Sequence, residues 1–261
     1  MRILVTFAVD EEFAPWRKLR SFRFVDCDGL QLWRSSLVDS EITVVVTGMG
    51  TEAAAQAMGV MMRMADDNRY FDVCISSGLA GALRAELLPG AIIAPQVLLA
   101  ESQHADLAWD RLNVDKELRE RALEAGAISV ECLLTASKIL AKTHQKQACS
   151  SKAQSVDMES FEIVKQASAW GARTVVVRAV SDTADEDLPI NFNRTLSKKN
   201  QISLSKVFLE LAKNPLALPA LVRFGRQSRR AAEALTRFLD KYVQGLTAGN
   251  YNGLKREAVP Q

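Results

Sequence analysis

The stretch at residues 174–182, T-V-V-V-R-A-V-S-D, decides the fold. It opens with four consecutive β-branched residues, which cannot alternate between a buried and an exposed face, so both faces must be covered. This pattern predicts an interior strand in a sheet flanked by helices. Burying the charges of Arg178 and Asp182 in such a strand is energetically unfavourable unless each charge is paired. Because open α/β sheets bind ligands beyond the carboxyl ends of their strands, we interpret Asp182 as a candidate functional carboxylate.

Two further apolar segments end in glycine-rich turns. Residues 42–47 (I-T-V-V-V-T) lead into Gly48, and residues 72–77 (D-V-C-I-S-S) lead into Gly78. Glycine at a strand end lets the backbone approach a ligand closely, although a tight turn alone also explains these glycines. With Asp182 at a third strand end, the pattern predicts that several strand ends converge on one pocket.

Acidic residues begin two of the expected helices. The strand expected over residues 2–8 leads into D-E-E at residues 10–12, and residues 155–170 are expected to form a helix with Glu159 in its first turn. Carboxylates at a helix start suit the helix dipole, so position alone demands no further role of Asp10, Glu11 or Glu159. The remaining pattern alternates strands with helices: strands over 30–34, 91–100 and 128–134, and helices over 52–64 and 115–125.

The composition fits one large globular domain, or a domain with an extension: the chain has 261 residues, 48% hydrophobic and 25% charged. A formal net charge of +2 gives no electrostatic case for nucleic acid. The four cysteines form no C-x-x-C pair, and we expect them to be reduced thiols of a cytoplasmic protein. Because the chain has only two histidines, a histidine metal site or a Ser/His/Asp triad is not expected. No apolar run approaches the roughly 20 residues that span a bilayer, and the run at 3–9 is too short for a signal peptide.

The C-terminal part differs in character from the rest. Between Leu218 and Tyr242, apolar residues recur every three or four positions while arginines crowd the other faces. Such a basic amphipathic helix docks on its own core, contacts a membrane surface weakly, or forms an oligomer contact. We expect a catalytic domain over residues 1–212, this helical extension over 213–245 and a flexible tail over 246–261.

Four segments together resemble the nucleoside phosphorylase superfamily, and most closely its methylthioadenosine/S-adenosylhomocysteine nucleosidase branch. They are A-V-D-E-E-F (8–13), T-G-M-G-T-E-A-A-A (47–55), S-S-G-L-A-G-A-L (76–83), and the pair V-D-M-E-S (156–160) with V-V-R-A-V-S-D-T-A-D (176–185). The resemblance implies a three-layer α/β/α sandwich around a twisted mixed sheet, forming a homodimer or higher homo-oligomer. It also implies cleavage of a purine–ribose N-glycosidic bond through an oxocarbenium-like cation, without metal or cofactor.

The resemblance implies catalytic roles residue by residue. Asp182 is similar to the general acid that protonates the purine at N7, and Ser181 to the residue that positions it. Glu159 resembles the carboxylate that holds the ribose hydroxyls beneath the cation. Glu12 resembles the base that orients the attacking water, and Arg178 its partner, which holds water or phosphate.

Smaller features are implied as substrate contacts. Met158 would pack on the sugar, and Gly78 would leave room for base or sugar against the backbone. Lys138 and Ile139 fall where the main chain of the family reads the purine edge, but the usual aromatic residue is absent there. The other implied contacts are Ser77 and Gly48.

Departures from the pattern keep alternatives open. Leu79 stands where the nucleosidase branch has a serine near the attacking water, and Asp157 replaces the usual glutamate. No G-D-P-x-R phosphate loop lies near the N-terminus, although Arg178 and the Gly48 loop could hold an anion. We predict hydrolysis of an adenosine-type nucleoside. The alternatives are a phosphorylase with phosphate as co-substrate, acting on a lipid-linked adenosyl substrate such as adenosylhopane, and a catalytically silent nucleoside-binding module.

Overall fold

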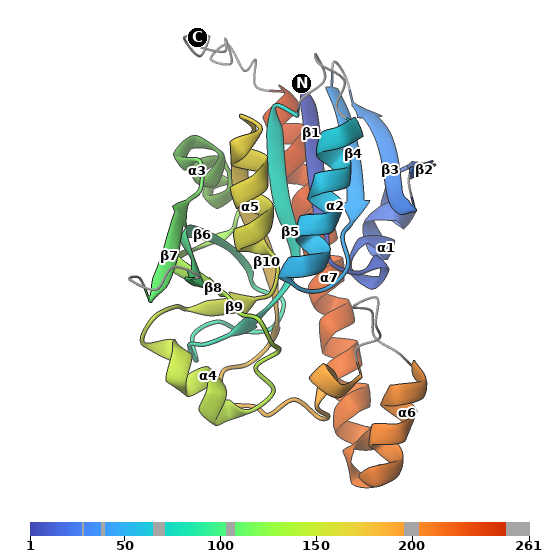
Figure 1. The fold of residues 1–261 in the computed structure, drawn as a ribbon, viewed down its shortest axis with the longest axis vertical. Coiled ribbons are helices and arrows are strands. Elements are labelled where there is room, and N and C mark those ends of the chain that lie inside the picture. The colour runs from blue at the N-terminus through green and yellow to red at the C-terminus, as the bar shows by residue number, and fades with distance from the viewer. Residues whose placement is uncertain (28, 38–39, 65–70, 103–107, 196–203, 249–261) are drawn as a thin grey trace.

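The computed structural model describes residues 1–27, 29–37, 40–64, 71–102, 108–195 and 204–248 (Figure 1). The strands are β1 (Arg2–Phe7), β2 (Arg23–Cys27), β3 (Leu30–Leu37), β4 (Ser40–Val46), β5 (Val73–Ala82), β6 (Ile92–Glu101), β7 (Trp109–Asn113), β8 (Ile128–Thr135), β9 (Ser155–Asp157) and β10 (Arg173–Asp182). The helices are α1 (Asp10–Leu19), α2 (Thr51–Met64), α3 (Lys116–Glu124), α4 (Thr143–Ser150), α5 (Ser160–Ala169), α6 (Leu204–Lys213) and α7 (Leu218–Ala248), with short 3-10 helices η1 (Phe192–Arg194) and η2 (Pro215–Ala217).

The strands form one ten-stranded mixed sheet in the order β10-β6-β8-β9-β5-β1-β4-β3-β2, with β7 on β6. β10 pairs with β5 as well as with β6, so part of the sheet closes on itself. β4, β1, β5 and β10 are parallel neighbours, and their carboxyl ends therefore meet at one edge, the lower one in Figure 1. The strand ends that carry the candidate residues thus converge, as the sequence predicts.

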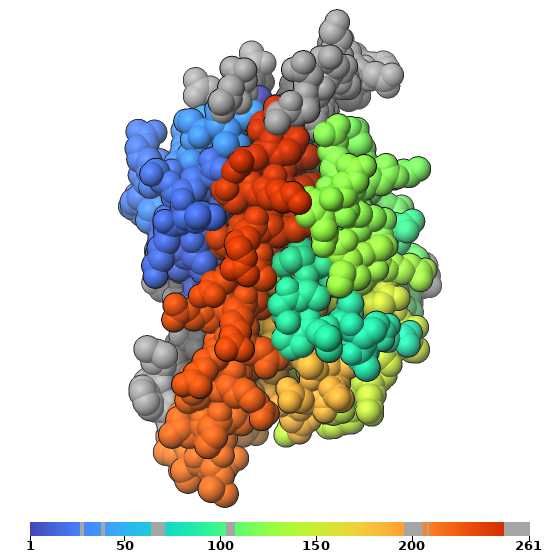
Figure 2. Space-filling view, turned by 180° about the vertical axis from the view of Figure 1, so that it is seen from behind, coloured from blue at the N-terminus to red at the C-terminus, as the bar shows by residue number. Residues whose placement is uncertain are grey.

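Alternate residues of the central strands face two different helical layers. Val5 of β1 packs in a cluster with side chains of α1, α3 and α7, whereas its neighbour Leu4 packs with α2 and α5. Val175 and Val177 of β10 face the same layer as Val5, and Val176 packs toward α5. Figure 1 shows α2 and α5 in front of the sheet, and Figure 2 shows α7 running along the back. The predicted fold, helices on both faces of a mixed sheet, is confirmed.

The two halves of α7 differ in burial. Buried residues recur at helical spacing from Ala231 to Leu246 and pack on the sheet between α1 and α3. The first half extends past the sheet beside α6 (Figure 1), and there Leu218 and Val222 are exposed. The second half therefore docks on the sheet, and the first half packs through Leu221 and Phe224 on a smaller cluster that contains Ile190 and Phe192. Leu246, expected in the flexible tail, is buried within α7, and residues 249–261 lie outside the described residues.

The expectation of a helix from residue 155 is wrong in its first turn. Ser155–Asp157 is strand β9, which pairs with β5 on one side and β8 on the other, and α5 begins only at Ser160. Glu159 is the N-cap residue of α5, and its carboxylate makes no cap hydrogen bond. Pairing on both edges of β9 outweighs local helix propensity. No helix among the described residues is long and apolar enough to cross a bilayer.

Candidate active site

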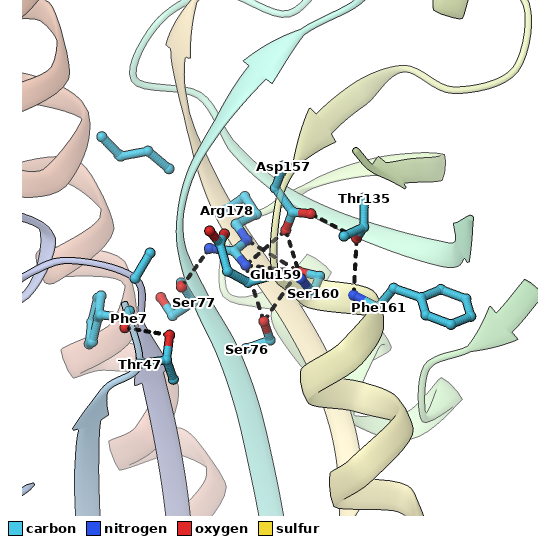
Figure 3. Close-up of polar contacts among 12 residues, drawn as sticks. Phe7, Thr47, Ser76, Ser77, Thr135, Asp157, Glu159, Ser160, Phe161 and Arg178 are labelled. Carbon is cyan, nitrogen blue, oxygen red and sulfur yellow. Dashed lines mark hydrogen bonds and ion pairs between the residues drawn. The ribbon is translucent and has the colours of Figure 1, made fainter. Parts of the chain in front are cut away.

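Arg178 is the centre of a buried polar cluster in the middle of β10, opposite Gly78 of β5, at the level where β1 and β4 end (Figure 3). Its side chain is 1% exposed. Its contacts are an ion pair from Nη2 to Asp157 Oδ2 (2.8 Å), hydrogen bonds from Nη2 to the hydroxyls of Ser76 (3.2 Å) and Ser160 (2.9 Å), and one from Nη1 to the Ser77 carbonyl (2.6 Å). These partners explain how an arginine is tolerated in so apolar a strand, because a buried charge requires pairing and hydrogen bonds.

The ion-pair partner of Arg178 is Asp157, not Glu12 as the resemblance implied. Asp157 is buried in β9, where Oδ1 accepts from Thr135 Oγ1 (2.8 Å) and Oδ2 accepts from the Ser160 N–H (3.3 Å). In the sequence, Asp157 stood out only as a replacement for the usual glutamate. Its role depends on β9, which local helix propensity conceals.

Glu12 lies at the start of α1, directly after β1, and is buried. Its two carboxylate oxygens accept main-chain N–H bonds, Oε2 from Ala8 (3.0 Å) and Oε1 from Leu79 (2.9 Å). Burial raises the pKa of Glu12, and the nearby Arg178 guanidinium and the main-chain donors oppose this shift in part. A carboxyl with a raised pKa, fixed at two points, suits a general base.

Gly78 makes room for both of these side chains. Its φ is +138°, and a Cβ added there would lie 2.8 Å from Glu12 Oε2 and would overlap Arg178 Nη1. Only a residue without a side chain therefore lets Glu12 and Arg178 meet over β5. The sequence predicts that another group approaches the backbone closely at Gly78. In the structure, the groups that approach it are the side chains of Glu12 and Arg178.

Glu159 lies beside Arg178 (Figure 3), and its Oε1 accepts the N–H of Gly50 (2.7 Å). Burial, and then the neighbouring Asp157 carboxylate, raise the pKa of Glu159 to about 7, while Arg178 opposes the shift. Met158 lies over the same glycine turn, with its Cε 3.7 Å from the position of a Gly50 Cβ. The turn after β4 thus supplies a main-chain donor to a carboxylate of the site.

Asp182 ends β10 and is held on both oxygens. Oδ1 accepts from Ser181 Oγ (2.6 Å), and Oδ2 forms an ion pair with Lys146 Nζ (2.6 Å). Ser181 is an extra residue relative to β5, since Val180 and Asp182 pair with consecutive residues there. Such a bulge re-aims the side chain that follows it. Lys146, which is buried, was not predicted from sequence.

The acidic and basic groups are spread along one strand. Arg178 pairs with Gly78 and Asp182 with Gly81, three residues further along β5, which places the two Cα atoms about 10 Å apart at roughly 3.3 Å per residue. Glu12 and Glu159 lie near Arg178 rather than near Asp182, since the positive charge of Arg178 acts to lower the pKa of both carboxyl groups. The edge therefore presents a carboxylate–guanidinium cluster at one end and a carboxylate–ammonium pair at the other.

Comparison with known proteins identifies the family. Residues 2–213 match the sequence profile of the Phosphorylase superfamily. The chain belongs to this superfamily. Its fold is shared by solved structures of a futalosine hydrolase mutant from Helicobacter pylori (17% identity, TM-score 0.71, covering 94% of this chain and 99% of that one). It is shared also by 5′-methylthioadenosine/S-adenosylhomocysteine nucleosidases from Helicobacter pylori (17%, 0.72, 94% and 98%) and Campylobacter jejuni (16%, 0.72, 94% and 99%).

The remaining site residues can now be placed in this superfamily member. Ser77 Oγ is buried and has no hydrogen-bond partner among the described residues, which leaves it available to a ligand. Gly48 has a φ of +87° and its N–H donates to the Ala8 carbonyl (3.0 Å), so it joins the ends of β4 and β1. Leu79 contributes its main-chain N–H to Glu12, a contact that does not depend on its side chain.

The segment expected to read the purine edge is already engaged. The Ile139 N–H donates to Asn193 Oδ1 (2.9 Å), and Asn193 Nδ2 donates to the Ile139 carbonyl (2.9 Å). Both main-chain groups of Ile139 are thus occupied by an amide side chain from η1, and Lys138 is exposed beside them. No group of histidine, cysteine and carboxylate side chains suited to a metal ion occurs in the described part of this superfamily member.

Proposed function

We propose that this protein hydrolyses the N-glycosidic bond of an adenosine-type purine nucleoside. The observation that carries the proposal is the arrangement along β10: Arg178 with Glu12 and Glu159 at one end and Asp182 at the other. Cleavage needs a proton for the departing purine, negative charge near the ribosyl cation, and an activated water. Each requirement has a candidate carboxyl on the same edge of the sheet.

At the Arg178 end, Glu12 would accept a proton from the attacking water. Its carboxylate oxygens are fixed by two main-chain N–H groups, and burial raises its pKa, which makes it a stronger base than an exposed glutamate. Glu159, whose pKa of about 7 leaves it substantially ionised at neutral pH, would hold the ribose hydroxyls and stabilise the cation. Met158 would pack on the sugar, and the buried Ser77 hydroxyl would supply a further contact.

At the other end, Asp182 would deliver a proton to N7 of the purine as the bond from C1′ to N9 breaks. The electron pair of that bond goes to the purine, and the oxygen of water forms the new bond to C1′. The reaction consumes only water and needs no metal or cofactor. Lys138 is proposed as a contact near the purine, and Ile139 could read it only if Asn193 moved away.

The charges around Arg178 favour water over phosphate as the acceptor. The guanidinium is surrounded by three buried carboxyl groups, Glu12, Asp157 and Glu159, and its Nη2 donors are already engaged. A phosphate dianion there would meet like charges without a free bidentate donor pair. Phosphorolysis, including that of a lipid-linked adenosyl substrate, is the alternative.

A paired assay tests the proposal. Methylthioadenosine, S-adenosylhomocysteine, futalosine, adenosine and inosine would be incubated with the protein, with and without phosphate, and base release would be followed by chromatography. We expect base release without phosphate for at least one adenosine-type substrate, and its loss in Asp182→Asn. Strict phosphate dependence would support the phosphorylase alternative, and tight nucleoside binding without release would support the silent binding module.

We also propose a cytoplasmic homo-oligomer whose α6–α7 end rests on anionic membrane surfaces. Leu216 is 88% exposed and Leu218 52% exposed at this end, and Arg223 and Arg226 are exposed beside them. Apolar side chains rimmed by arginine suit a lipid surface carrying negative charge. Flotation with phosphatidylglycerol vesicles, but not with phosphatidylcholine vesicles, is the expected result. Dissociation of the oligomer in Leu216→Ser, measured by sedimentation, would instead assign the surface to a second copy.

A further inference from the structure

The proton chemistry of Asp182 depends on a second buried residue. Lys146, in the middle of α4, is 1% exposed, and its ammonium has three partners: Asp182 Oδ2 (2.6 Å), the Thr183 carbonyl and the Glu186 carbonyl (3.1 Å). An ammonium has three N–H donors and no acceptor, so three acceptors satisfy the charged form completely. A neutral amine would turn its lone pair toward an oxygen. The geometry therefore holds Lys146 protonated.

The same contacts hold Asp182 as a carboxylate in the resting protein. Ser181 Oγ donates to Oδ1 and the ammonium donates to Oδ2, so both oxygens act as acceptors. A carboxylate cannot protonate a purine unless it first receives a proton. The only ammonium in contact with it belongs to Lys146, among the described residues.

The other charged groups around the pair are matched with one another. Arg223 of α7 forms an ion pair with Glu186 (3.6 Å), and Lys142, the N-cap residue of α4, pairs with Asp187 (2.9 Å). The other titratable groups of α4 are His144, which is exposed, and the partly buried Cys149. Lys146 and Asp182 thus form a separate unit, and Asp182 also lines a small pocket together with Glu186, Arg223 and Phe224, through which solvent reaches it.

We propose that Lys146 is a positioning residue for the proposed reaction and holds the proton that Asp182 delivers. As the bond from C1′ to N9 breaks, Asp182 takes a proton from the Lys146 ammonium and passes it to N7. The purine leaves neutral, Lys146 is left as an amine, and solvent returns the proton to it. The ammonium keeps a transferable proton beside Asp182, whereas a lone carboxyl must take its proton from solvent.

The test is the pH dependence of Lys146→Met compared with that of Lys142→Met, which breaks an exposed contact between the same helix and the same loop. kcat/KM would be measured from pH 5.5 to 9 with the nucleoside that the wild-type protein cleaves. We expect kcat/KM of Lys146→Met, relative to that of the wild type, to fall about tenfold per pH unit across this range, because the protonated fraction of a lone carboxyl falls by that factor above its ordinary pKa. Lys142→Met should follow the wild-type profile. A loss in Lys146→Met that is constant across pH would mark a purely structural role and overturn the proposal.

Two measurements keep the result interpretable. With 4-nitrophenyl riboside, whose leaving group needs no proton, the ratio of wild type to Lys146→Met should not change with pH; a pH-dependent ratio would contradict the proposal. In the wild-type protein, the ¹³C carboxyl signal of Asp182, assigned by its loss in Asp182→Asn, should be that of a carboxylate at pH 7, and a protonated signal would overturn the proposal. Since the proposal rests on the proposed function, absence of cleavage by the wild type would refute that function, whereas the carboxyl signal tests the pair without any turnover.

Discussion

Gly78→Ala tests whether the site is assembled around one missing side chain. The new Cβ would lie 2.8 Å from Glu12 Oε2 and would overlap the Arg178 guanidinium, at a φ of +138° that L-residues rarely adopt. Backbone strain of this kind costs about 1–3 kcal/mol. Overpacking in a filled interior costs about another 1–3 kcal/mol. We therefore expect a loss of about 2–6 kcal/mol in the free energy of unfolding.

The catalytic effect should be larger than the stability effect suggests. Glu12 and Arg178 cannot both keep their places, and a shift of about 1 Å in a catalytic group costs on the order of 10²-fold in rate. kcat/KM for base release should therefore fall by at least about 10²-fold. Urea denaturation and steady-state kinetics would measure the two effects in the same preparation.

Gly171→Ala is the matched control. Gly171 also has a positive φ, +79°, but nothing lies within 4 Å of the position of its Cβ. It should cost about 1–2 kcal/mol for the left-handed conformation and leave kcat/KM unchanged. Equal losses of stability in the two variants, with kcat/KM preserved in Gly78→Ala, would refute the argument that Gly78 makes room for Glu12 and Arg178.

Two carboxyl substitutions test the electrostatics of the cluster. Glu159→Gln should raise the melting temperature at pH 8 but not at pH 5. The pKa of Glu159 is raised from 4.5 to about 7, so between these two pH values the folded protein keeps a proton that the unfolded chain releases. The unfolding free energy of the wild type therefore falls as the pH rises through this window. Calorimetry at both pH values measures this, and equal shifts at the two would contradict the raised pKa. Glu12→Gln should lower kcat by about 10²–10⁴-fold with little change in KM, because it removes the base and keeps the shape; an effect confined to KM in steady-state kinetics would exclude Glu12 as the base.

The parts of the site that follow apolar strands could be predicted from sequence. Arg178 and Asp182 stand out because charges in a run of β-branched residues must be paired or functional. The glycine turns and the acidic residues after the first strand follow the same logic, since parallel strands bring their carboxyl ends to one edge. The helix-flanked sheet could be predicted from these patterns, which are local in the chain, and the three-layer fold class from the family resemblance.

The parts that depend on contacts between distant segments could not be predicted. Lys146 contacts Asp182, which lies 36 residues further along the chain. The helix that carries Lys146, T-H-Q-K-Q-A-C-S, has no apolar stripe that would predict a buried face. Asp157 reaches Arg178 because β9, only three residues long, is held by strands on both sides. The side-chain amide of Asn193, in a 3-10 turn, forms hydrogen bonds with the main-chain N–H and carbonyl of Ile139. Periodicity likewise predicts that α7 is amphipathic, but not which half of it is covered.

The most direct test of the central claim follows the oxygen that ends on the sugar. The protein would cleave its nucleoside substrate in H₂¹⁸O that contains phosphate, and the sugar product would be analysed by mass spectrometry. Hydrolysis at the Glu12–Arg178 end predicts free base together with a sugar that carries ¹⁸O at C1 and no phosphate, and neither product from Asp182→Asn. A sugar 1-phosphate, or cleavage undiminished in Asp182→Asn, would contradict the account.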